Sequence, residues 1–410
     1  MIKKHFLTMK KLFFIAYGGG HIKMLIPIIK YFRNHTNYDV TVFGLTTACS
    51  VLEKENIPYI SYQTFATQHT NDIGMKLLKN EETSSLISPN ESIAYHGINY
   101  IDLINQLGEN KAELVWKEKK RQCFNPINFF ITLLKEIKPD LVIATNSPRS
   151  EKAALDASRY LNITSICLVD MFALQEINWL SQKDYASKIC VLNNSVRDMF
   201  IQHGCSPESV VVTGNPAFDS INDKKYCDDA LKLRHSLCMN NDDKLIVYAS
   251  QPEPEQHPFC DKKGNPGLPR EIEIYLRNYI KNNKNKKLVL RYHPSENTIF
   301  NEQKNIFHSK KSDSLYTLLH AADLVIVTAS TVGLEASLIG KNVLSIDTSI
   351  FTDDAPFSKM GISIGVKRIS DLEYHINKIL APANQNRIKY DINEADATKK
   401  IINVIKSITC

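Results

Sequence analysis

The segment AADLVIVTASTVGLEASLIGKNVLSID, residues 321–347, constrains the fold more than any other part of the chain. A fully apolar run at Leu324–Val327 ends in small hydroxylated residues, which include Ser330 and Thr331. An apolar, helix-like segment follows and leads to a β-rich run at Asn342–Ile346. This order predicts a buried strand, a tight turn, a helix and a second strand. Buried strands that are joined by helices form parallel sheets, so the segment predicts an α/β domain.

Strands and helices alternate along most of the 410 residues, which are too many for one ordinary hydrophobic core. Apolar runs predict strands at 11–17, 38–44, 58–62, 140–144, 163–170, 186–192, 209–213, 244–250, 286–292, 324–329 and 342–346. Between about 64 and 125 the pattern is weak and polar, and it predicts helices and loops. We expect an α/β protein with two doubly wound parallel sheets, each in a Rossmann-like domain.

The segment Gly214-Asn215-Pro216 is the strongest break in this alternation. We place the domain boundary there, which gives an N-terminal domain of residues 9–214 and a C-terminal domain of residues 215–410 that ends in helices. Glycine adopts backbone angles that other residues avoid, and proline restricts the path of the chain. We therefore expect a hinge at this segment that closes the two domains over a ligand.

The charge balance argues against nucleic acid as a partner. The chain has 50 basic and 44 acidic residues, and the formal net charge of +6 is spread along the sequence. The densest basic cluster lies at 281–287 and fits a solvated helix end, or else contact with an anionic membrane surface or a polyanionic glycan. It lacks the interleaved aromatic residues that stack on bases.

The nine cysteines are scattered, and none of them forms a CxxC pair. This pattern argues against a structural zinc site and a disulfide framework, and it favours a reducing cytosol. Lysines precede a short apolar stretch at 12–17, as in a signal peptide, but no small-x-small cleavage site follows. We expect this stretch to be a first strand, with Met9 as a candidate start, and no segment has the length of a transmembrane helix.

In the second half, polar residues follow two predicted strands where ligands of α/β sheets bind. Ser330 and Thr331 begin a helix, whose N-terminus attracts a phosphate or a carboxylate; the alternative is an ordinary helix cap. His293 ends a strand before Pro294 and either donates to a phosphate oxygen or caps the strand. Arg291 points to the same face as His293, and it either reaches the ligand or pairs with a surface acid.

Two further residues follow the predicted strand 244–250. Gln251 and Glu253 lie in the sequence ASQPEPEQ, where two prolines stiffen the chain. Such a loop suits contacts to a base or a ribose, although turn chemistry alone explains it equally well. His257 repeats the His-Pro pair without a preceding strand, and we expect it to lie in a loop.

In the first half, glycines and two titratable residues follow predicted strands. Gly18, Gly19 and Gly20 permit a close approach of the backbone to a ligand. His21 and Asp170 both come just after buried strands, and either can act as a general base toward a hydroxyl. The alternative for each is a helix-capping role.

Four motifs carry a resemblance to known proteins: GGGH at 18–21, VVVTGNPAFD at 210–219, RYHP at 291–294 and TASTVGLEA at 328–336. Together they resemble the GT-B superfamily of nucleotide-sugar-dependent glycosyltransferases and the related non-hydrolysing sugar epimerases. The last two motifs are similar to the HP and hydroxyl-rich motifs of bacterial capsule transferases. Those include CMP-sialic-acid-dependent sialyltransferases, glycerophosphate polymerases and capsule Kdo transferases.

The resemblance implies a cytosolic glycosyltransferase that makes a surface polysaccharide and needs neither metal nor cofactor. The C-terminal domain would bind a CMP- or UDP-sugar through Gln251, Glu253, Arg291, His293, Ser330, Thr331 and Glu335. In the resembled family an acid near Glu335 often holds ribose hydroxyls; the alternative is a surface position. The N-terminal domain would bind a glycan or glycolipid acceptor around Gly18–Gly20, with His21, Asp170 and His293 as the catalytic residues. Peripheral association with a membrane-bound capsule assembly complex fits this role.

The chain also departs from the families it resembles. It lacks the paired-acid-plus-glycine motif of many bacterial sialyltransferases, which leaves the catalytic base open. The Arg-Pro-Glu loop of the epimerases is replaced by Gly19-Gly20-His21, and their acidic pairs have no clear counterpart. The two aspartate pairs, at 242–243 and 353–354, lie in polar turns, which disfavours a metal-dependent transferase. A UDP-N-acetylhexosamine 2-epimerase and a non-catalytic scaffold for capsule assembly are the alternatives.

Overall fold

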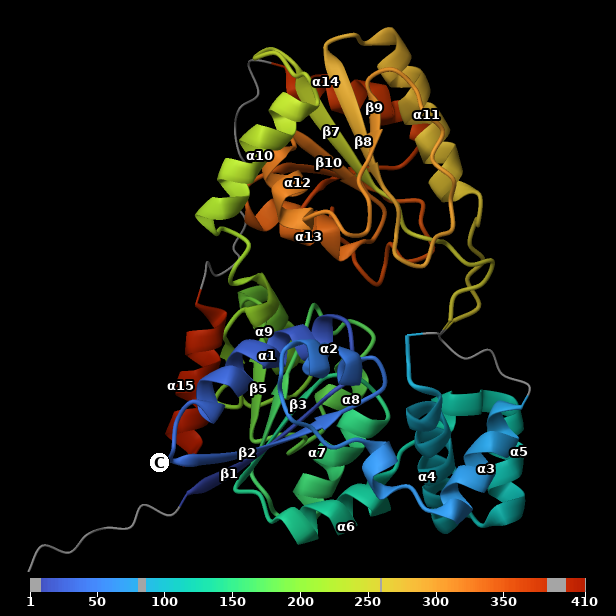
Figure 1. Ribbon diagram of the computed structural model, residues 1–410, viewed down its shortest axis with the longest axis vertical. Helices are drawn as coiled ribbons and strands as arrows, with labels where there is room; N and C mark the ends of the chain where they lie inside the picture. Colours follow the sequence, from blue (N-terminus) through green and yellow to red (C-terminus); the bar gives the residue numbers. More distant parts are fainter. Residues whose placement is uncertain (1–8, 80–85, 259, 382–395, 410) are drawn as a thin grey trace, which may run out of the picture. The chain divides into compact units, whose positions relative to one another are not determined.

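Two sheets, each of six parallel strands and flanked by helices, organise the chain (Figure 1). The structure, a computed structural model, describes residues 9–79, 86–258, 260–381 and 396–409. The first unit runs to Asp219 and also contains the C-terminal helix α15 (Ala397–Thr409), and the second unit begins at Ser220. The predicted α/β class with two doubly wound parallel sheets is confirmed.

The sheet of the first unit has the strand order β2-β1-β3-β4-β5-β6. Its strands are β1 (Lys10–Ala16), β2 (Tyr38–Gly44), β3 (Leu141–Thr145), β4 (Ser165–Leu168), β5 (Lys188–Val191) and β6 (Val210–Val212). Its helices are α1 (Gly20–Arg33), α2 (Ala48–Lys54), α6 (Ile127–Ile137), α7 (Ser150–Tyr160), α8 (Ile177–Leu180) and α9 (Asn194–Gln202). The strand predicted at 58–62 forms only a single bridge, between Ile60 and Phe43. Pro58 explains the difference, because proline cannot donate a ladder hydrogen bond.

The weakly patterned segment folds into the helices α3 (Gln68–Leu78), α4 (Pro89–Leu107) and α5 (Glu109–Lys119), which project to one side of the first sheet (Figure 1). Helices α3 and α4 pack with their backbones in contact. A Cβ atom at Gly74 would lie 2.0 Å from the Ile93 carbonyl oxygen, and one at Gly97 would lie 1.8 Å from that of Thr70. No helix in the described ranges is both long and apolar enough to cross a membrane.

The sheet of the second unit has the order β12-β11-β10-β7-β8-β9. Its strands are β7 (Lys244–Ala249), β8 (Lys286–Arg291), β9 (Ile306–His308), β10 (Leu324–Val327), β11 (Asn342–Ile346) and β12 (Ile364–Val366). Its helices are α10 (Lys224–Ser236), α11 (Leu268–Asn282), α12 (Leu315–Ala321), α13 (Thr331–Leu338) and α14 (Leu372–Leu380). The four long strands lie where the apolar runs predict them, and β9 and β12 are too short to leave such a run.

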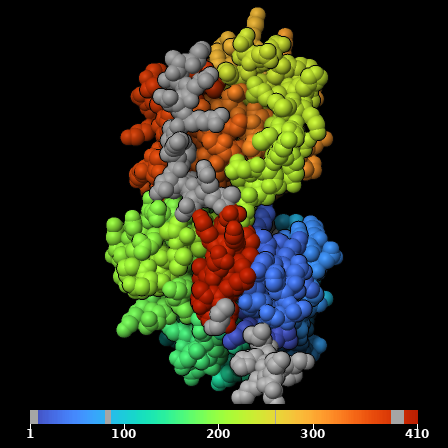
Figure 2. Space-filling model, turned by 90° about the vertical axis from the view of Figure 1, so that its left-hand side faces the viewer, coloured from blue at the N-terminus to red at the C-terminus, as the bar shows by residue number. Residues whose placement is uncertain are grey.

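Helix α15 packs on the first unit, whereas the sequence led us to place the C-terminal helices in the second domain. Figure 2 shows it in red, along the surface between blue and green segments of the first unit. Its residues Ile401, Ile402 and Ile405 join the core that α1 and β1 build. The carboxylate of Asp219 accepts hydrogen bonds from the first two backbone N–H groups of the helix, at 2.9 and 2.8 Å. An apolar stripe marks a buried face but does not show which core buries it.

The segment predicted as a hinge belongs to the first unit. The backbone N–H groups of Thr213 and Gly214 donate to the Val191 carbonyl at 3.0 and 3.2 Å. The Asn215 amide donates to the Asp170 carbonyl at 2.7 Å. The chain passes to the second unit only after Asp219, beyond the predicted boundary at 214/215. The TGN motif therefore fixes the end of β6 and the loop that carries Asp170.

We expect Ile401→Ala to destabilise the first unit by about 2–5 kcal/mol, because it empties a fully buried position in that core. Both tryptophans, Trp116 and Trp179, lie in the first unit, so their fluorescence during urea unfolding reports on that unit alone. Asn403→Ala, at an exposed position of the same helix, is the matched control. An unchanged fluorescence midpoint for Ile401→Ala would contradict the packing of α15 on this unit.

Candidate functional site

Each sheet has one place where the strand order reverses. In the first unit this place lies between the neighbouring strands β1 and β3, and in the second unit it lies between β7 and β10. In open parallel sheets, ligands bind beyond the carboxyl ends of the strands at such a place. Most of the residues that the sequence singles out lie in the loops that follow these strands or in the helices that those loops enter, whereas Asp170, Arg291 and His293 belong to the neighbouring strands β4 and β8 and the loops after them.

His21 and Asp170 are brought together in the first unit, although 148 residues separate them. The Nε2 atom of His21 lies 3.8 Å from the Oδ2 atom of Asp170, and the two side chains are 20% and 26% exposed. On the other side of the ring, Nδ1 lies 2.7 Å from the Oγ1 atom of Thr145, the last residue of β3. The ring is thus held between a hydroxyl and a carboxylate.

The carboxylate of Glu151, in the first turn of α7, decides which nitrogen of His21 carries the proton. Glu151 is fully buried and accepts from the backbone N–H groups of Tyr17, at 2.7 Å, and Ser147, at 2.9 Å. It also accepts the only proton of the Thr145 hydroxyl. The Thr145 oxygen must then accept from Nδ1–H of His21. The neutral ring presents an unprotonated Nε2 beside Asp170, which is the arrangement of a general base.

Asp170 is itself held at both backbone polar groups. Its N–H donates to the Asn146 side chain at 3.0 Å, and its carbonyl accepts from the amide of Asn215. A second carboxyl lies nearby: burial raises the pKa of Glu176, the charge of Asp170 raises it further, and His21 opposes this.

The sequence analysis missed Thr145, Asn146, Glu151 and Glu176. The first three lie in the polar run TNSPRSE, which follows an apolar strand and could have indicated them.

The three glycines before His21 differ in what surrounds them. A Cβ atom at Gly18 would lie 1.8 Å from the Thr47 hydroxyl, so this residue is small because the protein packs against it. Gly19 has a φ of 69° at the start of α1, and a Cβ atom at Gly19 or Gly20 would meet no atom within 4 Å. Only the last two glycines leave open space for a ligand.

In the second unit, Ser330 caps α13 by accepting from the backbone N–H of Val332 at 3.4 Å, and Thr331 is exposed at the first position of the helix. A Cβ atom at Gly333 would lie 2.8 Å from the Val327 side chain, so this glycine lets α13 pack directly on β10. The motif therefore places two hydroxyls at a helix N-terminus beyond the end of β10.

Arg291 bonds within its own unit. Its guanidinium donates to the Ser309 hydroxyl at 2.7 Å and to the backbone carbonyls of Lys310 and Asp313, each at 3.2 Å. Burial lowers the pKa of Arg291, and the charges of Asp313 and Glu335 oppose this change. Arg291 thus ties the end of β8 to the loop after β9, and Glu335 lies within its electrostatic reach.

His293 is exposed at the tip of a tight turn after β8. The backbone N–H of Ser295 donates to Nδ1 of His293 at 3.2 Å, so Nε2 carries the proton of the neutral ring. The backbone N–H of His293 donates to Glu296 at 2.7 Å. This turn presents Nε2–H of His293 as a hydrogen-bond donor toward solvent.

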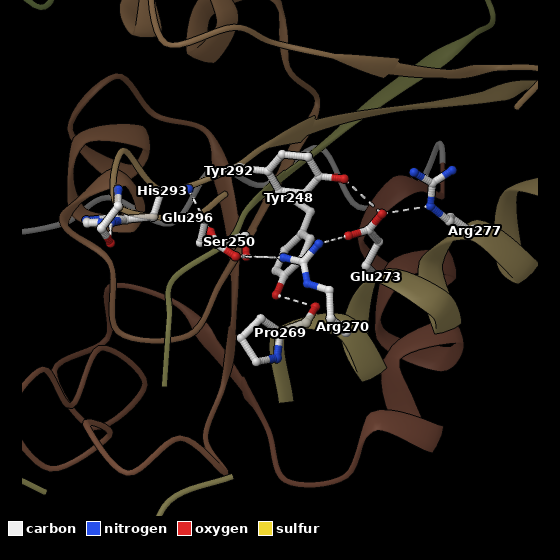
Figure 3. Close-up of polar contacts among 10 residues, drawn as sticks. Tyr248, Ser250, Pro269, Arg270, Glu273, Arg277, Tyr292, His293 and Glu296 are labelled. Atoms are coloured by element: carbon white, nitrogen blue, oxygen red, sulfur yellow. Dashed lines mark hydrogen bonds and ion pairs between the residues drawn. The ribbon is translucent and has the colours of Figure 1, made fainter. Parts of the chain in front are cut away.

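A network around Arg270, on α11, fixes this turn (Figure 3). Arg270 donates to Glu296 and to the Ser250 hydroxyl, both at 2.8 Å, and also bonds to Glu273. Its guanidinium stacks on the Tyr292 ring, 4.8 Å from the centroid. The loops after β7 and β8 are therefore braced by one arginine that the sequence analysis did not single out.

Two side-chain oxygens after β7 are buried without a hydrogen-bond partner, namely Oε1 of Gln251 and Oε2 of Glu253. Glu253 is 7% exposed, and its other oxygen accepts from the backbone N–H of Asn265 at 3.0 Å. An unpaired buried acceptor costs free energy that a ligand hydroxyl would recover. Both residues thus have the property expected of ligand-binding groups.

His257 lies in a loop, as predicted, but its side chain is buried, with its Nε2 atom 2.7 Å from a carboxylate oxygen of Asp354. The neighbouring Asp353 pairs with Lys262. Both aspartates of the second pair therefore bind basic residues. In the part of the chain that the structure describes, no group of three or more His, Cys, Asp or Glu residues is arranged to hold a metal ion.

The basic cluster 281–287 lies at the opposite end of the second sheet. Lys281, Lys284, Lys287 and Lys304 line a cavity of about 640 Å³ there. Lys287 is buried, and its ammonium donates to the carbonyls of Leu237 and Cys238, both at 2.9 Å. This lysine serves the fold, whereas Lys281 and Lys284 are exposed.

The same two-sheet architecture occurs in solved structures of other proteins. UDP-GlcNAc 2-epimerase from Neisseria meningitidis, bound to UDP-GlcNAc, has a TM-score of 0.63 at 13% identity over 97% of this chain and 100% of its own. MnaA of S. aureus with UDP has a TM-score of 0.61 at 14% identity, over 97% and 96%. Acinetobacter baumannii MurG has a TM-score of 0.55 at 14% identity, over 97% and 99%. These similarities define a GT-B fold.

Within that fold class, the chain belongs to a family described as "Protein of unknown function (DUF354)", which it matches over residues 111–407. The match includes strands of both sheets. A comparison with curated proteins finds no match.

We expect the stability of the first unit to fall as pH rises through the pKa of folded Glu176. Because this pKa is raised above the ordinary value of 4.5, the folded state holds the proton more tightly than the unfolded state. The stabilisation is complete below about pH 4.5 and is lost as pH increases. Glu176→Gln should reduce the pH dependence of the free energy of unfolding, measured by tryptophan fluorescence in urea. Glu118→Gln, at an exposed position, should leave that pH dependence unchanged. An identical pH slope for Glu176→Gln would contradict the assignment.

Proposed function

We propose that the protein is a metal-independent glycosyltransferase. It takes a sugar from a nucleotide-sugar donor bound by the second unit and transfers it to a hydroxyl of a glycan or glycolipid acceptor bound by the first. The His21–Asp170 pair carries this proposal. An imidazole with a fixed tautomer beside a carboxylate, at a sheet edge where ligands bind, is suited to remove a proton from a hydroxyl.

On the acceptor side, Nε2 of His21 takes the hydroxyl proton as the hydroxyl oxygen attacks the anomeric carbon of the donor sugar. The bond from that carbon to the phosphate oxygen breaks, and the nucleotide leaves. The ring becomes an imidazolium, which Asp170 stabilises from 3.8 Å. Thr145 and Glu151 keep Nδ1 protonated throughout, so the ring cannot turn the wrong nitrogen to the acceptor. Thr145 and Glu151 are positioning residues in this scheme.

On the donor side, the roles follow from the polarity of each group. Ser330, Thr331 and the N-terminus of α13 would bind a phosphate, and Nε2–H of His293 would donate to a phosphate oxygen. The unpaired oxygens of Gln251 and Glu253 would accept from sugar or ribose hydroxyls. Hydrogen-bond donors such as the N–H groups of the α13 N-terminus and of His293 offset phosphate charge without a metal ion.

The HP and hydroxyl-rich motifs support a finer assignment to surface polysaccharide synthesis, with a CMP- or UDP-sugar as donor and sialic acid as a candidate sugar. They resemble those of the polysialic acid capsule biosynthesis protein NeuE. In this proposal the protein works in the cytosol, at the inner face of the membrane where capsule precursors are assembled.

A non-hydrolysing UDP-N-acetylhexosamine 2-epimerase is the second candidate, and one observation favours it. Burial raises the pKa of Glu176, which lies within electrostatic reach of Asp170, and a pair of neighbouring carboxyl groups suits proton removal and return at one carbon. Incubation with UDP-GlcNAc alone separates the two functions. An epimerase inverts the configuration at C2 without an acceptor, and a transferase does not.

We expect His21→Gln and Asp170→Asn each to lower kcat by a factor of about 10²–10⁴, because each removes a part of the general base. The thermal midpoint of unfolding and donor affinity, measured by calorimetry, should remain close to those of the unmodified protein. His203→Gln, an exposed histidine of the same unit, is the control and should keep full activity. Activity within a few-fold of normal in both site variants would refute this role for the pair.

A further inference from the structure

Arg149, the residue before α7, has a backbone conformation that is normally reserved for glycine. Its φ and ψ are 72° and −114°. The residue before α1 has nearly the same angles, 69° and −133°, and there the chain uses Gly19. A side chain in this region strains the backbone. At one of two matching positions the sequence avoids the strain, and at the other it keeps an arginine.

The side chain of Arg149 is held by the Tyr17 side chain rather than by an ion pair. Its guanidinium carbon lies 5.3 Å from the centroid of the Tyr17 ring, and its Nε atom is buried with no hydrogen-bond partner. The Tyr17 hydroxyl is in turn fixed by Ser150 at 3.0 Å and by Tyr95 at 3.2 Å. Among the ion pairs of the described residues, none includes Arg149.

The nearest acid in sequence, Glu151, acts on this arginine through its charge but forms no ion pair with it. Burial lowers the pKa of Arg149, whereas Tyr95, Tyr17 and the charge of Glu151 raise it. The Glu151 carboxylate already accepts from Thr145, Ser147 and the backbone of Tyr17. A guanidinium that is stacked on an aromatic ring and forms no ion pair with a carboxylate retains hydrogen-bond donors for an external anion.

Arg149 lies at the same edge of the sheet as the His21–Asp170 pair. It follows β3, and the ring beneath it follows β1, so the two residues come from the strands that flank the reversal of strand order. Tyr17 is also four residues before His21 along the chain. An anion bound by Arg149 would therefore belong to the molecule whose hydroxyl faces His21.

We propose that Arg149 binds an anionic group of the acceptor, a carboxylate or a phosphate, and so makes the acceptor an acidic glycan or a phosphorylated glycolipid. This inference rests on the proposed function, because it names the substrate class of the same site. The planar guanidinium can donate two parallel hydrogen bonds to either oxyanion. The strained backbone of Arg149 then serves to direct its guanidinium toward the acceptor from the start of α7.

The test measures binding alone, by NMR titration. The probes are glucuronic acid against its methyl ester, and glucose 6-phosphate against glucose. Each pair differs only in the charged group, and the pair that shows the preference identifies carboxylate or phosphate. We expect the unmodified protein to bind one acidic probe at least tenfold more tightly than its neutral counterpart. Arg149→Gly should abolish that preference, and Arg149→Lys should keep part of it.

Thermal unfolding of the same variants separates recognition from a structural role. Arg149→Gly relieves the backbone strain, so its midpoint should equal or exceed that of the unmodified protein. Lys138→Gly is the matched control: this exposed residue ends α6 with a φ of 52°, and its replacement should leave the acid preference unchanged.

Three results would overturn the proposal: equal affinity for charged and neutral probes, a preference that survives in Arg149→Gly, or a lower midpoint for Arg149→Gly. None of these measurements uses a nucleotide sugar. A protein that prefers an acidic probe through Arg149 but binds no donor would refute the proposed function and leave this site standing.

Discussion

The buried carboxylate of Glu151 is the interaction on which the first unit's site depends. It ties the end of β1, through the backbone of Tyr17, to the end of β3, through Thr145, where the strand order reverses. Removal of this carboxylate would leave buried donors unpaired, which costs more than the hydrogen bonds themselves contribute. The same group sets the tautomer of His21, and it lies in the first turn of the helix that Arg149 precedes. One acid thus connects the loops after β1 and β3.

In the second unit an arginine, not a carboxylate, connects the loops that follow two neighbouring strands. Arg270 connects the loops after β7 and β8 through Ser250 and Glu296, and its stacking on Tyr292 fills the space between them. A charge so placed is stable only because its partners satisfy it. The backbone of the turn that carries His293 is thereby fixed, and its imidazole is exposed.

The sequence predicts what depends on local pattern. Continuous apolar runs predict the main strands of both sheets, because parallel strands are buried on both faces. His21 and Asp170 each come after such a strand, as predicted, whereas their distance of 3.8 Å was not predicted. Ser330 begins its helix as expected.

What the sequence does not predict depends on partners distant in the chain. The apolar stripe of α15 does not identify the first unit as its partner. The sequence ASQPEPEQ does not show that Ser250, at its start, accepts a hydrogen bond from Arg270. His257 has the same His-Pro pair as His293, yet one is buried against Asp354 and the other is exposed. Gly18 is small because of Thr47, not because of a ligand. Each of these outcomes is decided by tertiary packing.

The central claim, a nucleotide-sugar enzyme that handles phosphate without a metal, is tested most directly by thermal unfolding with CMP-, CDP- and UDP-sugars in the presence of EDTA. The account predicts that one of these nucleotides raises the midpoint, and that the increase grows with the logarithm of its concentration. An unchanged midpoint across the panel would contradict the claim and favour a scaffold that keeps the fold without binding a donor. A shift that appears only when a divalent cation replaces EDTA would contradict the metal-free account of phosphate binding.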